Sequence, residues 1–247
     1  MKNKREIFVA LGCSFTWGQG LYYYDIAKNS DMSQDEIKEF LMREDFLNSH
    51  HQWHKIKFKL TDGDWDSIKS LRSSDLVSKK LNIDYIMYNG DNQNNIKHIY
   101  EIYKDLKNDL LLNRKIKFVI LQLTHPGRDA KRPKHYTIKH IKNTISKIDE
   151  LYNFLKERDI ELLAWCMTED LGYSLKDKPY FLKIKVDGNN YNSFNAIVED
   201  NKPQFELRGD PDLINYGVTD EHPSKHFHKL ICDTILDKLE MKYEKSI

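Results

Sequence analysis

The sequence contains few cysteines, and they form no recognisable pattern. Cys13, Cys166 and Cys232 are too sparse and too irregularly spaced for a disulfide framework or a paired metal-ligand motif. An odd, low cysteine count is typical of a reducing compartment. Glycine and proline are also scarce, at 10 and 6 in 247 residues, which argues against a disordered chain. The sequence therefore predicts a folded, cytoplasmic protein.

Long apolar runs are absent as well. No stretch approaches the roughly 20 apolar residues that a membrane span needs. The basic N-terminus is followed only by the short run from Ile7 to Leu11. A signal peptide has a longer apolar stretch and a small-residue cleavage site. We therefore expect neither export nor a membrane partner.

The chain has no excess of charge of either sign. Its 39 basic and 38 acidic residues give a formal net charge of +1. A balanced protein has no global field that would gather nucleic acid, so such a partner would require a local basic patch. The length suits one domain spanning residues 1–247, and nothing in the sequence indicates an oligomeric state.

Short apolar runs alternate along the chain with helical patterns. The predicted strands are 7–11, 84–88, 117–123 and 160–165. The predicted helices, with apolar residues at helical spacing, are 74–81, 96–112, 138–155 and 223–243. This alternation predicts an α/β fold with a parallel sheet covered on both faces. Two stretches interrupt it, and we interpret them as insertions on the loop side of the sheet: 29–73, with a candidate helix 34–48, and 168–215, with a candidate strand 180–186.

The first predicted strand ends in Gly12-Cys-Ser14-Phe-Thr16-Trp-Gly18. Ligands of open α/β sheets bind at the carboxyl ends of the strands. A serine on this turn can project its hydroxyl into the crevice, and N–H groups at the next helix start can stabilise negative charge. Taken alone, the segment fits better with Ser14 as a simple helix cap.

A second polar segment, Asp220-Glu-His222-Pro-Ser224, precedes the last predicted helix. A nucleophilic serine needs a base, and the base needs a carboxylate that orients it. Alone, this segment also fits an exposed turn with Pro223 at the first helical position. The two segments together predict Ser14 as nucleophile, His222 as base and Asp220 as the orienting carboxylate.

The two segments resemble the first and last blocks of the SGNH (GDSL-like) hydrolases. The usual first block reads Gly-Asp-Ser-Phe/Leu-Thr-x-Gly, and Asn89-Gly90 stands where the second block supplies a glycine. The resemblance implies a flavodoxin-like three-layer α/β/α fold. It also implies hydrolysis or transfer of ester-linked acyl groups, often acetyl groups on carbohydrates, without a cofactor or metal. The implied partner is a small-molecule or glycan acyl ester.

The resemblance further implies an oxyanion hole made by the N–H groups of Ser14 and Gly90 and by one third-block side chain. The third block normally reads Gly-x-Asn-Asp, whereas this chain has Gln122-Leu-Thr-His-Pro-Gly-Arg128. Thr124 or His125 could supply the donor; Gln122 is less suitable because it still lies in the strand. The candidate substrate-binding residues are Trp17, Asn89 and Arg128.

Two other positions depart from the family pattern. Cys13 replaces the common Asp, at a position that is not the nucleophile. The usual Asp-x-x-His is shortened to Asp220-x-His222, so that Glu221 or Asp212 could replace Asp220.

Some features of the sequence fit functions other than a hydrolase. The altered third block and the basic-aromatic stretches 50–59 and 131–140 motivate a catalytically weak or inactive module that binds a glycan or nucleic acid. A metal site at His50, His51 and His54 is disfavoured because no carboxylate or cysteine completes a ligand set. A nucleotide-binding protein is disfavoured because no glycine-rich phosphate loop follows any strand.

Overall fold

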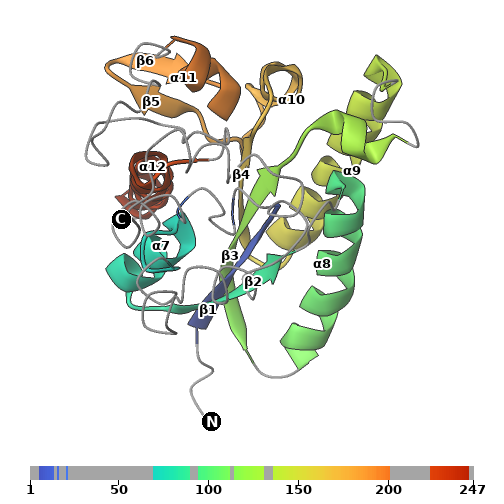
Figure 1. Cartoon of the computed structure of the whole chain (residues 1–247). Helices are drawn as coiled ribbons and strands as arrows, with labels where there is room; N and C mark the ends of the chain where they lie inside the picture. The colour runs from blue at the N-terminus through green and yellow to red at the C-terminus, as the bar shows by residue number, and fades with distance from the viewer. Residues whose placement is uncertain are drawn as a thin grey trace, which may run out of the picture.

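In the computed structural model (Figure 1), the described residues are 6–13, 16, 21, 69–89, 94–111, 114–130, 136–200 and 223–244. Their main element is a parallel sheet of four strands: β1 (Glu6–Gly12), β2 (Asp84–Asn89), β3 (Lys115–Leu123) and β4 (Glu161–Cys166). The strand order is β2-β1-β3-β4, with all three pairings parallel. This is the order of a flavodoxin-like, doubly wound sheet.

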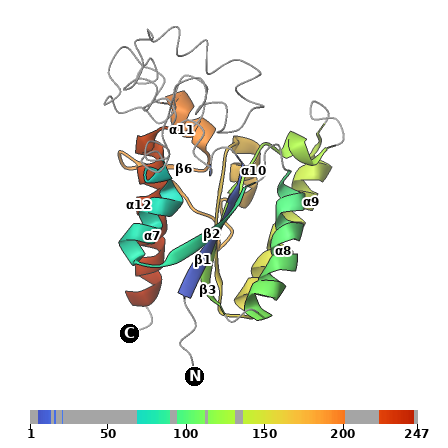
Figure 2. The same ribbon diagram turned by 60° about the horizontal axis from the view of Figure 1, so that its bottom comes forward.

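Helices cover both faces of this sheet. Figure 2 shows α7 (Ser73–Leu81) and α12 (Lys225–Glu244) on one side, with α8 (Asn95–Leu111) and α9 (Ile138–Lys156) on the other. The three-layer α/β/α fold predicted from the sequence is therefore confirmed.

The central strand β1 shows why this sequence folds as a buried parallel strand. Every residue from Ile7 to Leu11 is apolar, and all are at most 4% exposed. Ile7, Val9 and Leu11 belong to the core under α8 and α9, while Phe8 and Ala10 belong to the core under α7 and α12. A strand buried on both faces carries a continuous apolar run of this kind.

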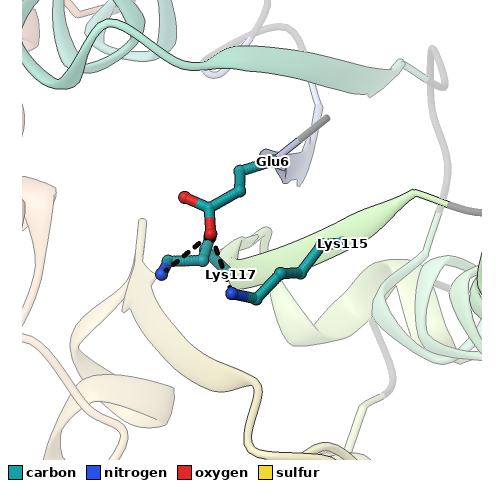
Figure 3. Close-up of polar contacts among 3 residues, drawn as sticks. All are labelled: Glu6, Lys115 and Lys117. Atoms are coloured by element: carbon teal, nitrogen blue, oxygen red, sulfur yellow. Dashed lines mark hydrogen bonds and ion pairs between the residues drawn. The ribbon is translucent and has the colours of Figure 1, made fainter. Parts of the chain in front are cut away.

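Charged side chains form a small cluster where strands β1 and β3 begin. Glu6 accepts hydrogen bonds from Lys115 (2.8 Å) and Lys117 (3.4 Å), as Figure 3 shows. The hydrogen bond from Lys115 is the main cause that lowers the pKa of the Glu6 carboxyl. All three side chains are between 30% and 57% exposed, so this cluster contributes little to stability.

The region after β4 contains more regular structure than the sequence indicated. It forms α10 (Glu169–Leu175), a hairpin of β5 (Ile184–Val186) and β6 (Asn189–Tyr191), and α11 (Phe194–Asp200). The candidate strand 180–186 is divided, because Phe181 bridges in parallel to Ala164 of β4 before the chain turns into the antiparallel hairpin.

A tight turn joins β5 to β6. Asp187 and Gly188 both have positive φ, at 47° and 86°, as a tight two-residue hairpin turn requires. An Asp-Gly pair between short strands is a recognised hairpin signal, so the sequence did contain the information.

The three cysteines are buried, and none of them forms a disulfide within the described residues. Within the described ranges, no helix combines the length and apolarity needed to cross a membrane. The candidate helix 34–48 and the histidines at 50, 51 and 54 lie outside the described residues.

Candidate functional site

The carboxyl end of β1 is fixed by a side chain from the neighbouring strand. Gln122 of β3 is 1% exposed, and its Oε1 accepts a hydrogen bond from the backbone N–H of Cys13 at 2.8 Å. The Thr16 hydroxyl approaches the same oxygen at 3.4 Å, and the Thr16 N–H donates to Cys13 O at 3.0 Å. The residues that flank Ser14 and Phe15 are therefore held in place by β3.

This close packing explains the glycine of the first block. A Cβ atom on Gly12 would lie 2.0 Å from Thr16 Oγ1 and 2.6 Å from Gln122 Oε1. Both distances are far below van der Waals contact, so any side chain at position 12 would push the two hydrogen-bonding partners apart. Gly12, Thr16 and Gln122 thus form one interlocked unit at the end of β1.

The third-block segment follows β3 at the same edge of the sheet. Thr124 is 1% exposed, and its hydroxyl has no hydrogen-bond partner among the described residues. The neighbouring polar groups are already engaged: Gln122 Nε2 donates to Leu123 O at 2.9 Å, and His125 Nδ1 accepts from Gly127 N at 2.9 Å. A buried hydroxyl without a partner is costly unless something binds it.

The backbone of Thr124 is held by Asn95, the first residue of α8. Asn95 accepts a hydrogen bond from Thr124 N and donates to Thr124 O. It also donates to Asp129, which ends the 3-10 helix η2 (Pro126–Asp129). The turn after β3 is thus anchored to the start of α8.

One turn along α8, His98 is a second buried polar group near this edge. It is 2% exposed, and neither ring nitrogen has a hydrogen-bond partner within the described part of the chain. Burial, together with the positive charges of Lys97 and Arg128, lowers the pKa of His98 to about 4. The imidazole is therefore neutral at ordinary pH.

The start of α12 reaches this edge from the other face of the sheet. Ser224 caps the helix by accepting a hydrogen bond from Phe227 N at 3.3 Å, so that the helix begins at Lys225. The Phe227 ring lies 5.5 Å from the ring of Trp165, near the end of β4. The start of α12 therefore packs near the carboxyl end of β4.

The predicted site residues divide into two groups. Thr124, His125 and Arg128 follow β3 as expected, and Asn89 ends β2 in register with Gly12 of β1. The remaining predicted residues lie outside the described residues: Ser14, Trp17, Gly90, Asp212, Asp220, Glu221 and His222.

Sequence reasoning missed Asn95 and Asp129. Asn95 belongs to an asparagine-rich run before a predicted helix, a pattern typical of helix capping. Asn94 fits that pattern, since its side chain accepts from Lys97 N at 2.7 Å. The contacts of Asn95 instead span 29 and 34 residues of sequence, which no local pattern reports.

Comparison with known proteins gives similarity at the level of the fold. No family model and no curated protein matches the chain. Among solved structures, the chain resembles a protein from Desulfitobacterium hafniense DCB-2 described as lipolytic and of the G-D-S-L family, at 12% identity and a TM-score of 0.42, over 95% of this chain and 99% of that one. It also resembles a carbohydrate esterase, at 13% identity and a TM-score of 0.44, over 98% of this chain and 66% of that one.

Proposed function

We propose that the protein is a serine esterase or deacylase that cleaves an ester-linked acyl group. One observation supports this most directly: Gln122 joins the residue before Ser14 to the strand end that carries Thr124. His222 directly precedes Pro223 in the sequence, and Ser224 caps α12. A nucleophile, a base and an oxyanion donor from three distant parts of the chain would thereby converge.

In the proposed mechanism, Ser14 Oγ attacks the acyl carbonyl carbon while His222 accepts the hydroxyl proton. Asp220 orients the imidazole and stabilises its positive charge. The imidazolium then protonates the leaving alcohol, and water or another acceptor releases the acyl group from Ser14. An acetyl group on a carbohydrate is the proposed substrate, bound with help from the side chains of Trp17, Asn89 and Arg128.

Thr124 is the better of the two third-block candidates for the oxyanion hole. Its hydroxyl is buried and has no described partner, so it can donate to a developing oxyanion beside the N–H groups of Ser14 and Gly90. The His125 ring instead accepts from Gly127 N and stands edge-on to Tyr136, with the ring centroids 5.0 Å apart.

Hydrolysis assays on p-nitrophenyl acetate and on acetylated saccharides test this proposal. Ser14→Ala should lower turnover by about four to six powers of ten. Thr124→Val should lower it by about 10²–10³, while Thr124→Ser, which keeps the hydroxyl, should retain most activity. An unchanged rate in folded Ser14→Ala protein would rule out the proposed nucleophile.

A lysine-lined groove favours a second candidate, an SGNH-like module that binds a polyanion. The groove has a volume of about 540 Å³ and lies between residues 176–185 and α12. Five lysines and two aspartates line it, and Lys178 also pairs with Asp149 at 2.7 Å: Lys176, Lys178, Lys183, Lys185, Lys238, Asp177 and Asp237. Salt-sensitive binding of an anionic polymer by a protein silent on every ester would favour this candidate.

A further inference from the structure

The start of α8 carries two adjacent asparagines with different roles. Asn94 caps the helix locally through Lys97 N. Asn95 does not cap the helix in this way, and it is 1% exposed. Its three hydrogen bonds all go to the segment after β3, so its side chain serves a distant part of the chain.

These bonds hold the backbone of Thr124 on both sides. Asn95 Oδ1 accepts from Thr124 N at 2.8 Å, and Asn95 Nδ2 donates to Thr124 O at 3.2 Å. A primary amide that pairs with both the N–H and the C=O of one residue mimics a strand partner. It fixes the position and the rotation of that residue at the point where β3 has ended.

Asp129 fixes Asn95 in turn. Its Oδ2 accepts from Asn95 Nδ2 at 2.8 Å and from the Thr144 hydroxyl at 2.9 Å. Its Oδ1 accepts from Ile96 N at 3.1 Å, which satisfies an N–H of the first turn of α8. One carboxylate therefore links the 3-10 helix after Thr124 to both α8 and α9.

We propose that Asn95 and Asp129 are positioning residues that hold the Thr124 hydroxyl where the oxyanion forms. This inference rests on the proposed esterase function. The hydrogen bonds of Asn95 and Asp129 form a clamp that ties the turn carrying Thr124 to the first turn of α8. Preorganised donors stabilise the transition state without reorganising during the reaction, and a misplacement of about 1 Å can cost about 10²-fold in rate.

Three variants test the clamp. Asn95→Ala removes all three hydrogen bonds. Asn95→Asp keeps an acceptor for Thr124 N but sets a carboxylate oxygen against Asp129 Oδ2, 2.8 Å away in the wild type. Adding Asp129→Asn to Asn95→Asp restores an amide-carboxylate pair with reversed polarity.

The matched control is Tyr180→Phe. Tyr180 is 1% exposed, and its hydroxyl donates to Asp149 of α9 at 2.8 Å rather than to the segment after β3. This variant also loses a hydrogen bond of a buried side chain. It should lower thermal stability without changing the kinetics.

Two readouts are needed: steady-state hydrolysis of p-nitrophenyl acetate below the unfolding transition, and amide hydrogen exchange. Asn95→Ala should lower kcat about ten- to hundredfold with little change in KM, because the loss falls on the transition state. Its Thr124 N–H should exchange faster, whereas the Cys13 N–H should not. Asn95→Asp should behave similarly, and the double variant should regain part of the kcat.

The outcomes separate the clamp from the esterase proposal. Faster Thr124 exchange with unchanged kcat would overturn the positioning role, as would equal kcat losses in Asn95→Ala and Tyr180→Phe. Unchanged Thr124 exchange would overturn the clamp itself. If the wild type hydrolyses no ester, the esterase proposal fails and the positioning role fails with it, whereas faster exchange would still establish the clamp as a structural device.

Discussion

Replacing Gln122 by Leu should destabilise the protein because it removes the acceptor of a buried backbone N–H. Gln122 is 1% exposed, and its Oε1 lies 2.8 Å from Cys13 N. Losing the partner of a buried donor costs about 1–3 kcal/mol. For a chain of this size, 1 kcal/mol lowers Tm by about 2–4 °C, so we expect a decrease of about 2–12 °C.

A matched variant separates the hydrogen bond from packing. Gln122→Glu keeps the shape and the acceptor of Cys13 N but sets a carboxylate oxygen against Leu123 O, where Nε2 now donates at 2.9 Å. Because this charge is buried, the Gln122→Glu protein should be less stable than Gln122→Leu at neutral pH. In acid the carboxyl is protonated, so the Gln122→Glu protein should regain part of its stability.

Thermal unfolding followed by circular dichroism, with urea titration as a check, measures both variants. A Gln122→Leu protein as stable as the wild type would refute the role assigned to Gln122. A Gln122→Glu protein more stable than Gln122→Leu at neutral pH would show that the site is more open to water than its burial indicates.

Three further changes test other parts of the structure. Burial lowers the pKa of His98 to about 4, whereas an unfolded histidine binds its proton below about pH 6.5. The free energy of unfolding should therefore fall by about 3 kcal/mol as the pH decreases from 6.5 to 4. In urea titrations, the His98→Gln protein should lack this part of the acid sensitivity. Gly172→Ala should cost about 1–3 kcal/mol by the same assay, since its Cβ would lie 2.1 Å from Asn192 O. Glu6→Gln should change stability by less than about 1 kcal/mol, because its ion pairs are exposed.

The layers of the fold could be predicted because their signals are local. The continuous apolar run of β1 indicated a strand buried on both faces, and helical spacing indicated α9 and α12. The candidate strand 180–186 included β5, but β6 was missed because it is only three residues long and begins with the exposed polar pair Asn189 and Asn190. There the turn pair Asp187-Gly188 was the more informative signal.

The site was only partly predictable, for the same physical reason. The segment around Ser14 and the Thr124 position follow from motifs that lie at strand ends. The role of Asn95 depends on its pairing with Thr124 and Asp129, which are distant in sequence. Such contacts exist only once the parallel strands have brought their carboxyl ends together.

Labelling with a fluorophosphonate probe tests the central claim most directly, because the probe reacts preferentially with an activated serine hydroxyl. The purified protein is treated with the probe, and the modified residue is mapped by mass spectrometry beside Ser14→Ala. The account predicts an adduct on Ser14, absent from the variant and slowed in Gln122→Leu. A folded wild-type protein that takes up no probe at Ser14 would contradict it.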